Sequence, residues 1–207
     1  MTTFEGREDT TLIERERFHF LEWGERGRPA VLCLHGFPDV PRTWEPLAQG
    51  LARAGYHVVA PWMRGYFPST LRGPIHIERL AEDALAFADF VSPNAPVHLV
   101  GHDWGAAVTY SALMLAPSRF SSAVTLAVPH PLAFFRMLAR DPSQVRRSWY
   151  MGFFQLPLVP ERALARGDYR FVEELWRSWS PSFPVSKEYL REVRDCLRAS
   201  MPAPLAY

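Results

Sequence analysis

The chain has few cysteines, a single lysine and no long apolar run, and each scarcity excludes a class of protein. Its two cysteines, Cys33 and Cys196, are too few for a disulfide framework in 207 residues. No apolar segment approaches the roughly 20 residues that a membrane-spanning helix needs. The formal net charge of +1 gives no electrostatic reason to expect nucleic acid or a membrane surface as a partner. Lys187 is the only lysine among 23 basic residues, a bias that indicates a GC-rich bacterial genome.

What is present is the composition of a globular protein, with 48% hydrophobic and 22% charged residues. A chain of 207 residues can hold one domain of ordinary size with a smaller appendage. Residues 1–10 are polar and include acidic side chains, so they do not form a signal peptide. We therefore expect a reducing, cytoplasmic location.

The first 129 residues alternate between strand and helix patterns. Apolar runs and partial alternation predict strands at 17–24, 31–34, 57–60, 97–100 and 123–128. Apolar residues spaced by threes and fours predict helices over 43–54, over 77–91 and from 104 to about 115. Such alternation predicts an α/β fold, a mostly parallel sheet with helices on both faces, and its ligands bind at the carboxyl ends of the strands.

From about residue 130 the pattern changes to helical, aromatic segments punctuated by proline. We interpret residues 130–207 as a helical cap, or lid, inserted after the last of these strands, and residues 1–129 as the core. Phe171, Leu175 and Trp176 form an apolar face on one cap helix, with Trp179 just beyond it. That face is interpreted as packing within the cap in preference to a ligand site.

The most informative motif is Gly101-His102-Asp103-Trp104-Gly105, which follows a predicted strand and opens a predicted helix. Strand, glycine-bracketed turn and helix are the context of a nucleophile elbow. A serine there suits acyl transfer, whereas an aspartate suits displacement at a saturated carbon, because the resulting ester can be hydrolysed. Asp103 thus indicates substrates such as epoxides or alkyl halides. Taken alone, the motif is also compatible with a simple polar turn.

Further short strings accompany this motif, and with them the chain resembles the α/β-hydrolase fold. Within that fold it is similar to the epoxide hydrolases and their haloalkane dehalogenase relatives. The strings that carry the resemblance are His35-Gly36-Phe37-Pro38-Asp39, Arg64-Gly65-Tyr66, Val128-Pro129-His130-Pro131, Trp149-Tyr150 and Phe154-Gln155-Leu156-Pro157.

The resemblance implies roles for several residues beside Asp103. The backbone N–H groups of Phe37 and Trp104 would form an oxyanion hole for the ester, and Tyr150 would donate a proton to the opened oxygen. His35 is expected to link loops by hydrogen bonding, and Pro38 to follow a cis peptide bond. A second cap tyrosine is expected near residues 205–207, with Tyr207 one position short of it.

Phe37 and Tyr150 separate the two activities. The dehalogenases that resemble this chain favour asparagine at the position of Phe37 as a halide donor, and phenylalanine has no such donor. A phenol, with a pKa of about 10, suits protonation of the alkoxide that epoxide opening produces. Trp104 occurs in both groups and does not discriminate.

The acid and the histidine of a catalytic triad are missing from their expected places. In this fold they follow the nucleophile along the chain, but none of the seven histidines lies beyond His130, the first residue of the cap. His102 is adjacent to Asp103, yet successive residues of such a turn point apart. We therefore expect the sequence to be a piece of a longer enzyme without the last strands of the sheet, poorly soluble or inactive in turnover by itself.

The sequence thus predicts a hydrolase that opens epoxides to vicinal diols through an aspartyl ester. Its substrate would be a small hydrophobic molecule, with water as co-substrate and no metal or organic cofactor. Two alternatives stay open: a dehalogenase that uses the same nucleophile, and a non-catalytic binding module.

Overall fold

A six-stranded mixed sheet lies at the centre of the computed structural model, which describes residues 6–182 and 185–207. The strand order is β1-β2-β4-β3-β5-β6, and β1 and β2 run antiparallel to their neighbours while β4, β3, β5 and β6 are parallel. The strands are β1 (Arg7–Ile13), β2 (Glu16–Trp23), β3 (Ala30–Leu34), β4 (His57–Pro61), β5 (Val97–His102) and β6 (Phe120–Leu126).

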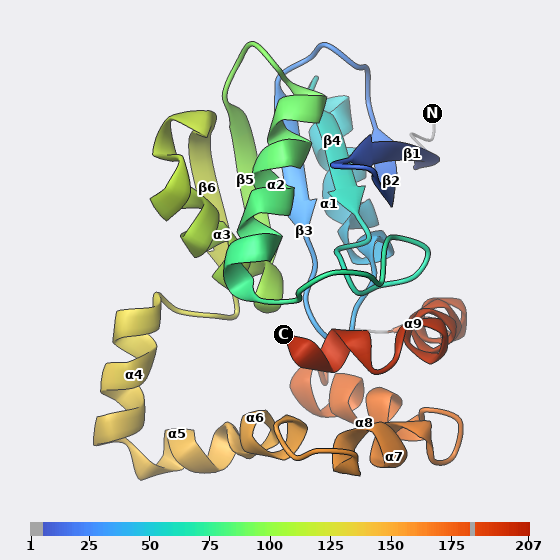
Figure 1. Ribbon diagram of the computed structural model, residues 1–207, viewed down its shortest axis with the longest axis vertical. Coiled ribbons are helices and arrows are strands. Elements are labelled where there is room, and N and C mark those ends of the chain that lie inside the picture. Colours follow the sequence, from blue (N-terminus) through green and yellow to red (C-terminus); the bar gives the residue numbers. More distant parts are fainter. Residues whose placement is uncertain (1–5, 183–184) are drawn as a thin grey trace.

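Three α-helices cover the sheet, with α1 (Glu45–Arg53) on one face and α2 (Ile77–Val91) and α3 (Trp104–Leu115) on the other (Figure 1). A short 3₁₀ helix, η1 (Pro41–Trp44), precedes α1, and a second, η2 (Pro117–Arg119), precedes β6. Strands β3 and β4 are buried along their whole length, as expected for parallel strands covered on both faces. The predicted α/β architecture is therefore confirmed, with each predicted helix within about two residues of an observed one.

The sheet edges differ from the prediction. Strand β1 was not predicted, because most of its residues are polar and exposed and backbone pairing with β2 determines its place. Strand β6 begins three residues before the predicted range 123–128 and ends at Leu126. It pairs only with β5 within the described chain, and most of its residues are exposed.

The rest of the chain is helical and lies beyond the carboxyl edge of the sheet (Figure 1). Its helices are α4 (Pro131–Arg140), α5 (Pro142–Arg147), α6 (Trp149–Phe154), α7 (Val159–Ala165), α8 (Arg170–Trp179), α9 (Lys187–Ser200) and η3 (Ala203–Ala206). We call this set the C-terminal helices. They begin where the sequence predicts the change of pattern, and their description as a separate domain over residues 130–207 stays a prediction.

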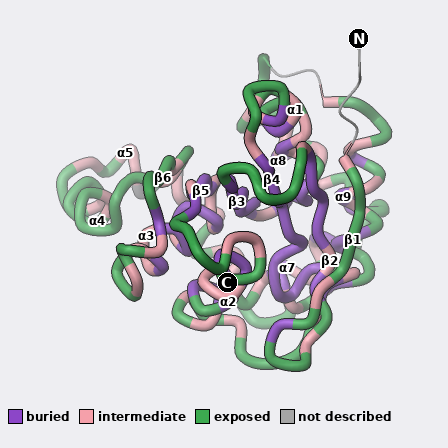
Figure 2. Tube along the Cα trace, turned by 90° about the horizontal axis from the view of Figure 1, so that it is seen from above, coloured by how far each residue is buried: buried purple, intermediate pink, exposed green. Residues whose placement is uncertain are grey.

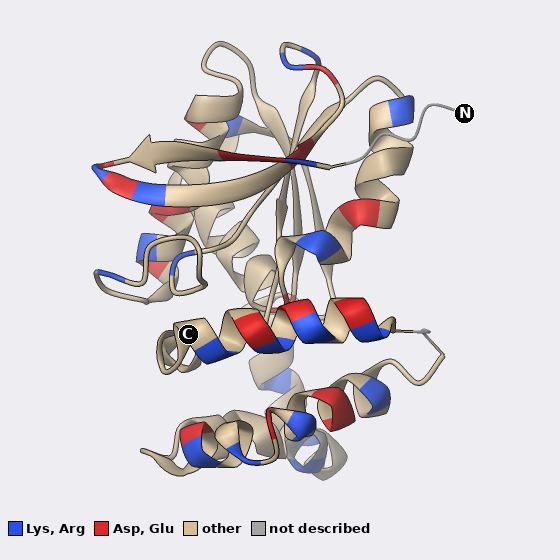
Figure 3. Ribbon diagram, turned by 90° about the vertical axis from the view of Figure 1, so that its right-hand side faces the viewer, with Lys and Arg blue, Asp and Glu red and all other residues tan. Residues whose placement is uncertain are grey.

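Burial follows this division. Figure 2 shows buried residues concentrated on the inner strands, whereas the residues of α4 are exposed or half-buried. Helix α9 carries alternating basic and acidic residues along its length (Figure 3) and buries Leu190, Val193 and Leu197. None of the described helices has the length and hydropathy to cross a bilayer.

Candidate active site

Asp103 occupies the sharp turn between β5 and α3. Its backbone has φ 54° and ψ −118°, a conformation that a residue with a side chain rarely adopts. The glycines around it are required by close packing. A Cβ added to Gly105 would lie 2.1 Å from the carbonyl oxygen of Leu34, and one added to Gly36 would lie 2.4 Å from the Cβ of Asp103.

The carboxylate of Asp103 meets the loop that follows β3. The backbone N–H of Phe37 donates to Asp103 Oδ1 over 2.9 Å, and the backbone N–H of Trp104 also bonds the carboxylate. Burial raises the pKa of Asp103, while these two donors and neighbouring His102 lower that pKa by a smaller amount. The two backbone groups that the resemblance names as oxyanion donors thus already point at the carboxylate.

His35 holds the loop that carries Phe37. It is fully buried, its Nδ1–H donates to the carbonyl oxygen of Gly36 over 3.0 Å, and its Nε2 accepts from the N–H of Met63 over 3.2 Å. Burial lowers its pKa to about 4, so the ring is neutral at neutral pH. These contacts link the loops after β3 and β4, as the sequence predicts. The Phe37–Pro38 peptide bond is cis, also as predicted.

A cavity of about 360 Å³ opens above Asp103. Aromatic side chains from the core and from the C-terminal helices form most of its wall. The lining residues are Phe37, Asp103, Trp104, Tyr150, Met151, Gly152, Phe154, Gln155, Trp179, Pro204, Leu205 and Tyr207. The space is large enough for a small apolar molecule and offers a carboxylate and a phenol as its main chemical groups.

Tyr150 faces this cavity from α6, as the prediction requires. Its hydroxyl makes no hydrogen bond to any residue that the structure describes. Burial and the charge of Asp103 raise the pKa of Tyr150, so the phenol keeps its proton at neutral pH. The hydroxyl is therefore a free donor close to the carboxylate.

Tyr207 lines the same cavity with its ring but points its hydroxyl elsewhere. The ring packs against that of Trp104, with 6.0 Å between centroids, and the hydroxyl donates to the carbonyl oxygen of Arg64 over 2.6 Å. Tyr207 is therefore not oriented as the second phenol.

The sequence did not identify two contributions of α8. Trp179 was placed just beyond an apolar face, yet it is 43% exposed and lines the cavity. Of the predicted face, Leu175 is buried, and Phe171 is half-buried and packs against Phe153 of α6. Trp176 is also half-buried, and it donates its indole N–H to the carbonyl oxygen of Pro38 over 2.9 Å. The helical spacing marks these aromatic residues, but the sequence alone does not tell which part of the core they meet.

No histidine lines this cavity among the described residues. His102 is adjacent to Asp103 in the chain and is half-buried, and burial lowers its pKa. Across the described ranges, no three His, Cys, Asp or Glu side chains gather in a way that could hold a metal ion.

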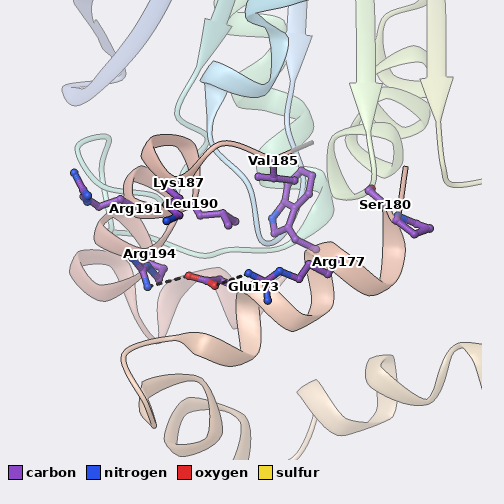
Figure 4. Close-up of a pocket in the computed structure, with 10 residues that line it drawn as sticks. Glu173, Arg177, Ser180, Val185, Lys187, Leu190, Arg191 and Arg194 are labelled. Carbon is purple, nitrogen blue, oxygen red and sulfur yellow. Dashed lines mark hydrogen bonds and ion pairs between the residues drawn. The ribbon is translucent and has the colours of Figure 1, made fainter. Parts of the chain in front are cut away.

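A larger cavity, of about 440 Å³, lies between α8 and α9 (Figure 4). Glu173 bridges Arg177 and Arg194 at its lower wall, with N···O distances of 3.5 and 3.0 Å. It contains neither Asp103 nor Tyr150. The site of interest is therefore the smaller, aromatic cavity.

Residues 29–194 match the α/β-hydrolase fold family. The chain belongs to this family. It is 32% identical to human epoxide hydrolase 4 over 169 aligned residues. This alignment covers 79% of this chain and 46% of the relative. The chain is 37% identical over 157 residues to epoxide hydrolase A of Mycobacterium tuberculosis, covering 72% and 47%.

Solved structures agree with this assignment. An epoxide hydrolase from Vigna radiata superposes with a TM-score of 0.76 at 26% identity, covering 98% of this chain and 70% of that one. Epoxide hydrolase A from Mycobacterium thermoresistibile gives a TM-score of 0.73 at 26% identity, covering 98% and 73%. The chain spans about half the length of the curated relatives it matches.

Proposed function

We propose that this chain carries the nucleophilic part of an epoxide hydrolase and that Asp103 is its nucleophile. The observation that carries the proposal is the placement of Asp103. Its carboxylate accepts from the Phe37 and Trp104 backbone N–H groups at the floor of an aromatic cavity that the free hydroxyl of Tyr150 also faces. The similarity to epoxide hydrolases supports the same chemistry.

Ring opening follows from these groups. One carboxylate oxygen of Asp103 bonds to an oxirane carbon, and the bond between that carbon and the ring oxygen breaks. The electron pair stays on the ring oxygen, which takes the phenolic proton of Tyr150, and the tyrosinate regains a proton from water. The product of this step is a 2-hydroxyalkyl ester of Asp103.

Hydrolysis of the ester would use the two backbone donors. Water attacks the carbonyl carbon of the ester, and negative charge develops on the oxygen that Phe37 and Trp104 hold. In comparable sites one such donor contributes about 2.7–4 kcal/mol. The water also needs a general base. We assign this base to none of the described histidines, since none of them lines the cavity.

We also propose that the C-terminal helices act as the cap of this site. Three of their elements, α6, α8 and η3, contribute side chains to the cavity wall. The substrate would be a small hydrophobic epoxide because the wall is largely aromatic. A cytoplasmic, bacterial origin remains part of the proposal on the sequence grounds given above.

Dehalogenation is less well supported. A departing halide needs donors at the leaving-group position, and the side chain of Phe37 has none. Tyr150 instead offers an acidic hydrogen, which suits an alkoxide better than a chloride or bromide.

Intact-mass spectrometry can test the proposal. The protein would be incubated with 1,2-epoxyhexane or 1-bromohexane, the reaction quenched with acid, and the intact mass of the protein measured. We expect an added mass equal to the whole epoxide, little reaction with the bromide, and no adduct on D103N. Asp89→Asn, which changes an exposed carboxylate paired with Arg119, is the control and should react like the native protein. A hexyl adduct from the bromide, formed in preference to the epoxide adduct, would indicate a dehalogenase. Reversible binding without any adduct would indicate a binding module.

A further inference from the structure

The loop that carries Phe37 is held from the side of the C-terminal helices as well as from the core. Trp176 of α8 donates its indole N–H to the carbonyl oxygen of Pro38 over 2.9 Å. Tyr189 of α9 donates its hydroxyl to the carboxylate of Asp39. Both acceptors directly follow Phe37 in the chain, and both donors come from helices more than a hundred residues away.

The two donors form one unit. The rings of Trp176 and Tyr189 pack edge to face, with 5.5 Å between centroids and an interplanar angle of 86°. Phe154 of α6 adds a third contact, because its ring packs against that of Phe37 with 5.1 Å between centroids. The loop therefore cannot move without breaking contacts to three of these helices.

The contact with Tyr189 is important because the carboxyl of Asp39 is buried. The residue is only 2% exposed, and its Oδ1 accepts from its neighbour, the N–H of Val40, over 2.7 Å. Its Oδ2 has no hydrogen-bond partner among the described residues. Thr43 of η1 also bonds this carboxyl. A buried carboxyl with so few donors depends strongly on each one, and Tyr189 is the donor that comes from the C-terminal helices.

We propose that Tyr189 and Trp176 are positioning residues, which hold residues 37–39 so that the Phe37 backbone N–H stays directed at Asp103. This inference rests on the proposed function, since it assigns a task in the same reaction. Neither side chain is among the residues that line the reaction cavity, so they would act on the reaction only through the loop.

A positioning role predicts a shift in the pH profile that simple packing does not. The Phe37 N–H is one of the groups that lower the pKa of Asp103, so a loosened loop raises that pKa. Attack requires the ionised carboxylate, and its onset would therefore move to higher pH. Asp103 also interacts electrostatically with His102, Tyr150, Tyr66 and Asp39. Asp39 loses a hydrogen-bond donor in Tyr189→Phe, whereas Trp176→Phe leaves the contacts of all four groups as they are.

The experiment compares Tyr189→Phe and Trp176→Phe with the native protein. The readout is the rate of adduct formation with 1,2-epoxyhexane between pH 5 and 9. We expect each variant to react about tenfold more slowly at pH 7, less than the loss of a whole donor would cause, with the onset of reaction at higher pH. Tyr169→Phe is the matched control, because it removes a tyrosine hydroxyl of the C-terminal helices that makes no hydrogen bond to a described residue. Folded variants with an unchanged profile would overturn the inference.

Native-state hydrogen exchange gives a second test, which needs neither a variant nor a reaction. If α8 and α9 hold the loop, the Phe37 amide exchanges at low denaturant with the same opening free energy as the amides of these helices. Opening of Phe37 together with strand β3 would contradict the inference. Because exchange is independent of chemistry, it decides on the loop contacts even if no adduct forms and the proposed function fails.

Discussion

At the scale of single residues, the environment of each side chain decides its protonation state at the site. Asp103 and Tyr150 share one apolar cavity, and burial raises the pKa of both. The carboxylate nevertheless keeps two backbone donors, whereas the phenol makes no hydrogen bond to a described residue. The first arrangement favours a nucleophile, and the second favours a proton donor.

Replacement of Tyr150 by phenylalanine should slow ring opening without moving the site of attack. A positioned general acid typically contributes at least about a hundredfold to the rate. We therefore expect adduct formation with 1,2-epoxyhexane to slow about a hundredfold in Tyr150→Phe, measured by quenched intact mass. Tyr56→Phe, which removes a hydroxyl without a described hydrogen-bond partner far from the cavity, should react normally. Equal rates in the two variants would remove Tyr150 from the mechanism.

His35 should make the protein sensitive to acid. Its pKa is about 4 in the folded protein, lowered by burial from 6.5, so the unfolded chain takes up a proton first as the pH falls. The neutral ring stabilises the fold fully above pH 6.5, and this contribution of about 3 kcal/mol is lost between pH 6.5 and 4. Urea unfolding should show that the free energy of unfolding falls less between pH 6.5 and 4 in His35→Gln than in the native protein. The same loss in both would show that other groups cause it.

At the scale of elements, the turn between β5 and α3 requires glycine at position 105, whereas helix α1 does not require the glycine at position 50. Gly105→Ala would place a methyl group 2.1 Å from the Leu34 carbonyl oxygen, whereas Gly50 in α1 has open space around it. We expect Gly105→Ala to lower the free energy of unfolding by about 3 kcal/mol or more and Gly50→Ala to raise it by about 0.5–1 kcal/mol. Urea denaturation of both variants checks this. A similar effect at the two positions would mean that packing at the turn is loose.

Elements with strong patterns were predictable from the sequence. The stripe of apolar residues at spacings of three and four gave α2 its observed bounds, Ile77–Val91. The apolar runs located β3 and β4, because strands covered on both faces leave an unbroken signal. Strand β1 left no such signal, because backbone pairing with β2 determines it and its side chains are polar.

The core half of the site was predictable from its motifs, and Tyr150 is the residue of the C-terminal helices that the resemblance also identified. Phe37 and Asp103 meet because carboxyl ends of neighbouring parallel strands share an edge, and β3 pairs with β5. The contacts of Trp176, Trp179 and Tyr207 depend on how helices remote in sequence dock on that edge. No local pattern contains this information.

At the scale of the whole molecule, the two edges of the sheet differ in character. Strand β1 presents mostly polar residues, with Leu12 as the exception, whereas β6 presents two large apolar side chains, Val124 at 50% and Leu126 at 42% exposed. An apolar strand edge promotes association between chains. Val124→Lys should therefore reduce self-association, measured by light scattering against concentration. Leu12→Lys, at a 68% exposed position on β1, is the control and should change it less. Equal effects of the two substitutions would mean that self-association does not depend on β6.

The central claim is that the side chain of Asp103 becomes esterified by the substrate. Peptide mapping of the acid-quenched protein after reaction with 1,2-epoxyhexane tests it most directly. The account predicts one labelled peptide, with the tag on Asp103. A tag on His102 or on any other side chain, or no tag at all, would contradict the account.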